Sequence, residues 1–186
     1  LYEPTSGSVL MDGFDINQLD PADLRHNVAY VAQDAKLYFG TLRDNITFGL
    51  NGITDQQVVD AAEQAGILEL VNSHPLGFEM PVGERGETLS GGQRSAIAMA
   101  RVFLRKPRVL VMDEPTSAMD QGTEERLTQQ IKTRFSNSTL LIITHKMSML
   151  TLVDRLIVVD RGVIISDGPK SEVLAALKEG KIRGKS

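Results

Sequence analysis

A four-residue turn, Ser90–Gln93, has the composition of an anion-binding site. Ser90 is a favourable N-cap for the helical pattern that follows, and Gly91 and Gly92 let a ligand approach the main chain closely. Gln93 adds a side-chain amide in the first turn. A helix that begins in this way directs free N–H groups and its positive dipole end at a ligand, which suits a phosphate. The alternative is a capped helix after a glycine loop, and for this turn alone that alternative is the more common case.

Two carboxylates, Asp113 and Glu114, follow the apolar run Val109–Met112. A buried strand that ends here places both at the carboxyl edge of a sheet, where α/β proteins bind ligands. Hard cations prefer oxygen ligands, and hydrolysis requires a base near the attacking water. Both kinds of chemistry are therefore open to this pair, and a solvated acidic strand end is a plausible alternative for the pair alone.

Gln33 and His145 each end another apolar run. A neutral amide at a strand end is able to meet a metal or a water, but it is equally common as a surface group. A lone histidine in such a position is often structural. His26 and His74 have no comparable context, and we interpret both as structural.

Strand and helix patterns alternate along the chain and would position these residues. Strands are expected at residues 8–11, 28–32, 109–112, 139–144, 155–159 and 163–166, and helices at 21–25, 54–66, 67–71, 94–105, 122–135, 147–152 and 170–178. Continuous apolar strands between helices imply a parallel sheet covered on both faces. Asp12-Gly13 predicts a hairpin, and Asp20 before Pro21 predicts a capped helix start. Residues 45–105 read as mostly helical, which predicts a helical subdomain inserted into an α/β core.

The composition is that of an ordinary globular protein. A net charge of −4 argues against a general nucleic-acid binder. The chain has no cysteine, which excludes disulfides and thiolate metal sites. No apolar run approaches the roughly 20 residues that span a bilayer, so we expect any membrane contact to be made through a partner domain.

The order of the motifs resembles the nucleotide-binding domains of ABC (ATP-binding cassette) proteins, exporter type. Leu89–Gln93 matches the signature motif, Val109–Glu114 the Walker B strand, and Ser117–Asp120 the D-loop, with Met119 where leucine is usual. The resemblance covers nearly all of the 186 residues. It implies an α/β fold of the P-loop NTPase (RecA-like) class, with a parallel core sheet, an inserted helical subdomain and a partial antiparallel β region at the N-terminus.

The same resemblance divides the chain into four parts. Residues 1–44 would hold the end of the β subdomain and the Q-loop strand, and residues 45–105 the helical signature subdomain. Residues 106–178 would form the α/β core with the Walker B motif, D-loop and switch histidine, and residues 179–186 a tail.

ATP and Mg²⁺ are the ligands that the resemblance implies. Asp113 would hold Mg²⁺ through water, Glu114 would polarise the attacking water, and His145 would contact the γ-phosphate as the switch histidine. Gln33 would be the Q-loop residue, which meets Mg²⁺ or the attacking water and reports the nucleotide state to a transport domain.

A second nucleotide-binding domain is the first partner implied. In a head-to-tail dimer, Ser90, Gly91, Gly92 and Gln93 would bind the ATP held by the other subunit, and Asp120 would communicate across the dimer. A capped structural helix makes a different prediction, since Gly92→Asp would then be harmless or mildly stabilising through the helix dipole.

Transmembrane domains, fused or separate, are the second partner implied. Residues 82–86 resemble the exporter loop whose acidic residue meets the membrane domain, and the aromatic segment after Gln33 fits a coupling surface. The carboxyl end resembles the ATPases of bacterial type I protein secretion. These features predict export of a protein or peptide from the cytoplasmic face of the bacterial inner membrane.

No G-x-x-x-x-G-K-[ST] phosphate loop occurs in the sequence. The resemblance therefore predicts an amino-terminally truncated cassette that hydrolyses ATP in the complete protein and is inactive alone. Non-transport ABC ATPases of DNA repair or translation are one alternative, but they predict long heptad arms or a second cassette, and neither is present. A fragment that acts only as an interaction module is the other.

Overall fold

Three parallel strands form the central sheet: β3 (Val28–Val31), β4 (Val109–Asp113) and β5 (Thr139–Ile143), with β4 in the middle. The computed structural model describes residues 4–181, and these divide into one unit that ends at Thr144 and another that begins at His145. The sheet belongs to the first unit. Its parallel pairing confirms the α/β fold class that the alternating pattern predicts.

Within the described residues of the first unit, only one face of this sheet is covered. Val31 and Leu110 lie on the covered face and are buried, whereas Tyr30, Leu141 and Ile143 on the opposite face are 61%, 52% and 51% exposed. The prediction that both faces are covered is therefore not met within the first unit. The apolar runs indicate that the strands favour burial, but they do not specify which element packs on each face.

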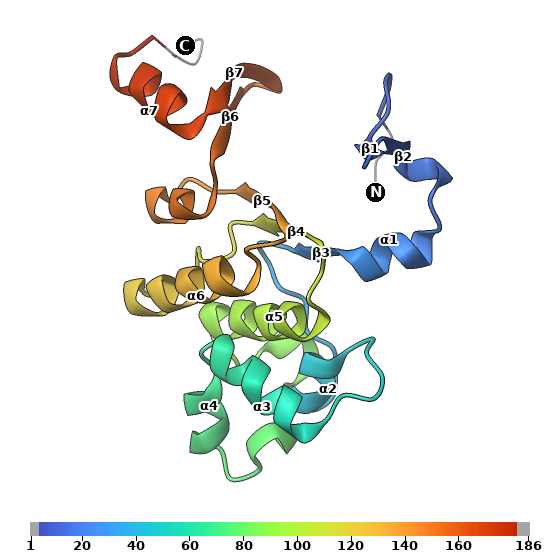
Figure 1. Cartoon of the computed structure of the whole chain (residues 1–186). Coiled ribbons are helices and arrows are strands. Elements are labelled where there is room, and N and C mark those ends of the chain that lie inside the picture. Colours follow the sequence, from blue (N-terminus) through green and yellow to red (C-terminus); the bar gives the residue numbers. More distant parts are fainter. Residues whose placement is uncertain (1–3, 182–186) are drawn as a thin grey trace. The chain divides into compact units, whose positions relative to one another are not determined.

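The covered face lies against the helices that follow the sheet strands in sequence (Figure 1). The longest is α5 (Gly91–Arg105), and after β4 comes α6 (Gln121–Arg134), which buries Leu127 and Ile131. Phe103 of α5 stacks on Phe135, just after α6, with ring centroids 5.7 Å apart. The apolar side of α5 therefore holds the core of the first unit together.

A block of short helices packs on the other side of α5 (Figure 1). It contains α2 (Leu42–Thr47), α3 (Asp55–Gln64), α4 (Leu68–Ser73) and the 3₁₀ helices η2 (Gly77–Glu79) and η3 (Glu84–Gly86). This arrangement matches the mostly helical block that the sequence predicts. Capping boxes begin two of its helices, Thr41 with Asp44 at α2 and Thr54 with Gln57 at α3.

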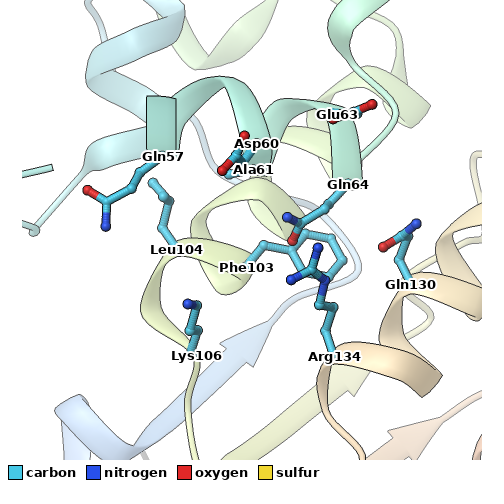
Figure 2. A pocket seen from close by; sticks show the side chains of 10 residues that line it. All are labelled: Gln57, Asp60, Ala61, Glu63, Gln64, Phe103, Leu104, Lys106, Gln130 and Arg134. Atoms are coloured by element: carbon cyan, nitrogen blue, oxygen red, sulfur yellow. The ribbon is translucent and has the colours of Figure 1, made fainter. Parts of the chain in front are cut away.

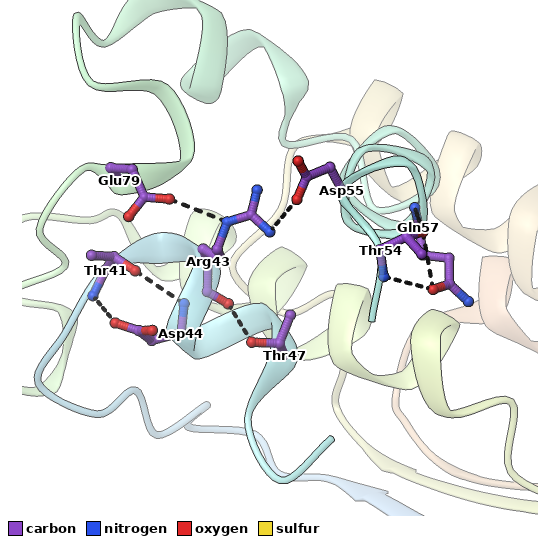
Figure 3. A network of polar contacts seen from close by, with 8 residues as sticks. All are labelled: Thr41, Arg43, Asp44, Thr47, Thr54, Asp55, Gln57 and Glu79. Carbon is purple, nitrogen blue, oxygen red and sulfur yellow. Dashed lines mark hydrogen bonds and ion pairs between the residues drawn. The ribbon is translucent and has the colours of Figure 1, made fainter. Parts of the chain in front are cut away.

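Arg43 ties this block together (Figure 3). Its guanidinium lies 2.9 Å from Asp55 at the start of α3 and 3.1 Å from Glu79 in η2. One side chain of α2 therefore pairs with two neighbouring elements, although each ion pair is largely exposed and contributes little by itself.

The amino-terminal part of the first unit contains a short hairpin and a helix. β1 (Leu10–Met11) pairs antiparallel with β2 (Phe14–Asp15), and Asp12 and Gly13 between them have φ of 50° and 84°. The 3₁₀ helix η1 (Ile16–Gln18) leads to α1 (Pro21–Asn27), where the Ala22 N–H donates to Asp20 Oδ1 at 2.6 Å. Both the hairpin and the helix cap are therefore confirmed, and α1 extends two residues beyond the predicted end.

The second unit consists of η4 (Met147–Leu152), β6 (Arg155–Asp160), β7 (Val163–Pro169) and α7 (Lys170–Lys178). The two strands form an antiparallel hairpin through Arg161-Gly162, and Arg155 and Asp167 make a two-pronged ion pair with both contacts at 2.7 Å. The helix predicted at residues 147–152 is present and is a 3₁₀ helix. Most of the predicted tail lies outside the described residues.

Candidate functional site

The Ser90–Gln93 turn begins α5 through a reciprocal capping box. The Gln93 N–H donates to Ser90 Oγ at 3.2 Å, and the Ser90 N–H donates to Gln93 Oε1 at 2.8 Å. Ser90 is thus the N-cap, as predicted. The Gln93 amide oxygen accepts the Ser90 N–H in return, and this role was not predicted from the sequence. The signal was available, because a serine three residues before glutamine is the capping-box pattern. By helix geometry the N–H groups of Gly91 and Gly92 have no acceptor within the helix, so the turn retains its anion-binding character.

The turn shares a cavity of about 200 Å³ with the segment before α6. Ser90, Gly92 and Gln93 line one side, and Ala118, Met119, Asp120 and Thr123 line another, with the remainder coming from Gly66, Ile67, Glu69, Leu70 and Ala96. The structure therefore brings the predicted ATP-binding turn and the predicted D-loop residue Asp120 to one place.

The Ser90–Gln93 turn and the segment before α6 contact each other at Gly91 and Gly92. A Cβ built on Gly91 would lie 2.9 Å from Ala118 Cβ, and a Cβ built on Gly92 would lie 2.9 Å from the Ala118 carbonyl oxygen. Neither distance is compatible with a side chain at these positions unless the loop moves. This contact overturns the expectation that Gly92→Asp is harmless in a purely structural helix, because any side chain at residue 92 collides with backbone.

Asp120 is the N-cap of α6. Its Oδ1 accepts from the Thr123 N–H at 2.9 Å, and its Oδ2 accepts from the Thr123 hydroxyl at 2.7 Å. The main-chain hydrogen bond from Thr123, followed by the hydroxyl bond, holds the pKa of Asp120 below its ordinary value. The carboxylate therefore has a structural partner within its own subunit.

Asp113 and Glu114 lie at the carboxyl end of β4, at the sheet edge that the sequence predicts. Glu114 has a φ of 46°, which is uncommon for a residue with a side chain. Its main-chain N–H donates to the Ile143 carbonyl at 2.9 Å, and its Oε2 lies 3.5 Å from the Thr144 hydroxyl. The end of β5 therefore fixes the main chain at Glu114.

Tyr30 adds a neighbour to Asp113 that the sequence analysis missed. Its hydroxyl on β3 lies 3.5 Å from Asp113 Oδ2. Only the pairing of β3 with β4 brings these two residues together, so no local pattern indicates the contact.

Gln33 and His145 belong to different units of the chain. Gln33 is exposed two residues beyond the end of β3, whose carboxyl end lies at the same sheet edge as that of β4. His145 is exposed and is the first residue of the second unit. The structure thus brings Gln33 to the edge that carries Asp113 and Glu114, whereas His145 belongs to a separately described part.

Magnesium fits the chemistry of this edge only with ligands from outside the protein. Within residues 4–181, no three side chains of histidine, aspartate or glutamate lie close enough together to hold a metal ion. Mg²⁺ retains several waters and substrate phosphate oxygens in many protein sites, so one or two oxygen side chains are sufficient. Asp113 and Gln33 supply such oxygens.

A larger cavity of about 550 Å³ lies away from these residues (Figure 2). Its wall is built from α3, the end of α5 and α6, and none of the predicted site residues lines it. Asp60, Glu63, Lys106 and Arg134 line it, so both signs of charge are present, and all four side chains are exposed. We assign no ligand to this cavity.

The fold and site define a nucleotide-binding cassette, and the chain belongs to the ABC transporter family. The ABC transporter family model matches residues 1–117. The structure is similar to that of a bacterial Atm1-family ABC exporter with ATP bound, with a TM-score of 0.89 and 33% identity, over 94% of this chain and 31% of that one. The resemblance found in the motifs is therefore confirmed.

Characterised or named relatives are similar along almost the whole chain. The putative multidrug export ATP-binding/permease protein YgaD of Bacillus subtilis is 38% identical over 93% of this chain and 30% of its own length. The heterocyst differentiation ATP-binding protein HepA of a Nostoc species is 36% identical over 93% of this chain and 28% of its own length. The multidrug efflux ATP-binding/permease protein Rv0194 of Mycobacterium tuberculosis is 42% identical over 92% of this chain and 14% of its own length. The chain thus spans less than a third of these relatives.

Proposed function

We propose that this chain is the ATP-binding and hydrolysing part of a membrane exporter. The observation that carries the proposal is the shared cavity of the Ser90–Gln93 turn and Asp120, in a chain whose Glu114 ends the middle strand of the sheet. The exporter class rests on relatives that join an ATP-binding part to a permease part.

The Ser90–Gln93 turn binds a phosphate in this proposal. Its capping box fixes the first turn of α5, and the two glycine N–H groups lie at the positive end of the helix dipole. As the family resemblance implies, the phosphate belongs to ATP held by a second nucleotide-binding domain. The turn therefore completes a site that two domains share.

Glu114 acts as the base in the proposed hydrolysis. The chain fixes its main chain at a positive φ and brings Thr144 beside its carboxylate, so the side chain is oriented rather than free to rotate in solvent. Asp113 and Gln33 supply oxygens for Mg²⁺ at the same edge. When bound, Mg²⁺ would neutralise phosphate charge.

His145 and Asp120 complete the proposed set. His145 follows Thr144 directly and would contact the γ-phosphate, as the family resemblance implies. Asp120 holds the first turn of α6 and thereby fixes the D-loop that would communicate across the dimer.

An exposed aromatic patch, made of Tyr38, Phe39 and Phe48, is the proposed contact with a transmembrane domain. Tyr38 and Phe48 stack with ring centroids 4.1 Å apart, and Phe39 is 85% exposed. The loop 82–86 lies close to the segment that carries this patch, since a Cβ built on Gly86 would lie 2.9 Å from Leu37 Cδ1. No helix among the described residues is long and apolar enough to cross a bilayer, and the membrane domain in this proposal is a partner, fused or separate.

The cargo and the cellular site remain predictions. The carboxyl-terminal sequence predicts a protein or peptide, exported from the cytoplasmic face of a bacterial inner membrane. Two relatives carry names that refer to multidrug export or efflux, which favours small molecules as the alternative cargo. Transport of a labelled peptide and of an apolar dye by the reconstituted complete protein separates the two.

Substitution of Glu114 by glutamine in the complete protein tests the hydrolytic role. Because glutamine keeps the shape and removes the base, we expect turnover to fall by about 10²-fold or more while ATP still holds the dimer together. Glu172→Gln, an exposed change on α7, is the matched control and is expected to leave turnover unchanged. Normal hydrolysis by the Glu114→Gln protein would contradict the assignment.

A further inference from the structure

The loop between β4 and α6 is held in shape by its own hydrogen bonds. The Ser117 N–H donates to the Glu114 carbonyl, and the Met119 N–H donates to the Thr116 carbonyl, both at 3.1 Å. The Asp120 carboxylate then caps α6. The loop therefore connects Glu114 to α6 through consecutive tight turns.

Ala118 lies at the tip of this loop, directly over the first turn of α5. The hypothetical Cβ atoms of Gly91 and Gly92 would each lie 2.9 Å from an atom of Ala118, in one case its Cβ and in the other its carbonyl oxygen. Real Cβ atoms essentially never approach so closely. The loop is thus seated on α5 as closely as two glycines permit.

We propose that Ala118 is a positioning residue, which seats the loop 117–120 on Gly91 and Gly92 so that the signature turn and Asp120 move as one unit. The contact itself follows from the packing, whereas its consequence for ATP turnover rests on the proposed function. Two separate close approaches then require glycine at residues 91 and 92. One is the approach of phosphate to the helix N–H groups, and the other is the approach of the subunit's own loop.

The two glycines differ in what they meet, and this difference provides an internal control. The obstacle for a methyl group at residue 91 is the Ala118 side chain, which Ala118→Gly removes. The obstacle at residue 92 is the Ala118 main chain, which no substitution at residue 118 removes. Ala118→Gly is therefore expected to rescue Gly91→Ala and to leave Gly92→Ala unrescued.

The experiment is a set of double-mutant cycles in the complete protein, with melting temperature, kcat and KM for ATP measured for each variant. Gly91→Ala is expected to lower the melting temperature and to reduce kcat about tenfold, within the range of coupling between contacting residues, with little change in KM. The Gly91→Ala, Ala118→Gly double variant is expected to recover most of the loss in melting temperature and the part of the kcat loss that the contact with Ala118 causes. Gly168→Ala is the matched control, because its new methyl group meets only Val173 Cγ2 at 3.7 Å.

Each outcome decides the proposal. If Gly91→Ala does not fold, recovery of folded protein in the double variant counts as rescue. A loss of kcat at Gly91→Ala with an unchanged melting temperature and no rescue would mean that phosphate approach alone requires the glycine, and this result overturns the proposal. Rescue of Gly92→Ala as well would also overturn it, since the effect would then be general loosening of the loop. If the complete protein does not hydrolyse ATP, the proposed function fails, but the melting-temperature cycle still tests the contact.

Discussion

Asn45 holds the segment after β3 onto the signature helix. It is 1% exposed, its Oδ1 accepts from the Tyr38 N–H at 2.8 Å and from Arg101 Nη2 at 2.9 Å, and its Nδ2 donates to the carbonyls of Tyr38 and Thr41 at 2.9 and 3.0 Å. All four bonds of a buried amide are thus made within one cluster. The amide links α2, the aromatic patch and α5.

Arg101 strengthens the same cluster from α5. It donates to the main-chain carbonyls of Lys36 and Asn45, and its guanidinium lies 5.7 Å from the Tyr38 ring centroid and 5.9 Å from that of Phe48. Burial lowers the pKa of Arg101 from its ordinary value, although the group remains charged at any physiological pH. The proposed membrane contact is therefore connected to the helix that begins at the signature turn.

Removal of the Asn45 amide is expected to destabilise the first unit. Asn45→Ala leaves the Tyr38 N–H and one Arg101 N–H without their buried acceptor, so the free energy of unfolding should fall by about 1–3 kcal/mol. Chemical denaturation measures the change, with Asn51→Ala, an exposed asparagine, as the control. A loss no larger than that of the control would show that water replaces the amide.

At the scale of an element, the cap of α6 makes stability depend on pH. The hydrogen bonds from Thr123 lower the folded pKa of Asp120, so its contribution is present above the unfolded pKa of about 3.9 and is lost as the pH falls through the folded pKa. We expect Asp120→Ala to lower the melting temperature at pH 7 and to have little effect near pH 2. Asp34→Ala, an exposed aspartate outside any helix start, is the control. An equal loss at both pH values would contradict the ionised cap.

The central sheet makes a second prediction at this scale, because its two faces are packed differently. Leu110 is fully buried on β4, whereas Leu141 on β5 is 52% exposed. Leu110→Ala should therefore cost about 2–5 kcal/mol in the free energy of unfolding of this chain, and Leu141→Ala clearly less. The two changes remove the same atoms from neighbouring strands, so denaturant titration compares burial directly. Similar losses would mean that the outer face is covered in solution.

At the scale of the whole molecule, the 186-residue chain is expected not to turn over ATP. The sequence contains no phosphate loop and no lysine in such a loop to neutralise the β- and γ-phosphates. Magnesium-dependent ATP hydrolysis by the purified chain, compared with the Glu114→Gln chain as a blank, checks this expectation. Turnover at the rate of a complete cassette, abolished in the blank, would show that the chain binds phosphate by other groups.

Residue types and their spacing were sufficient to predict the local structure and the order of the motifs. The Asp12-Gly13 hairpin, the Asp20 and Ser90 caps and the position of Glu114 after an apolar strand all depend on interactions within a few residues of each other, so residue types and spacing suffice to predict them. The same spacing identified the family.

The contacts between these elements could not be predicted in this way, because they depend on how the chain folds. Gly91 and Ala118 are far apart in sequence, and so are Asn45 and Arg101, and their contacts depend on the path that brings the segments together. The sequence predicted a sheet covered on both faces, whereas the described residues of the first unit cover one. Apolar strands indicate that burial is favourable, but they do not specify which element packs on each face. The same limit applies to Gly91 and Gly92. The sequence indicated that some group approaches the main chain closely at these glycines, and the fold identified the loop 117–120 of the same subunit as one such group.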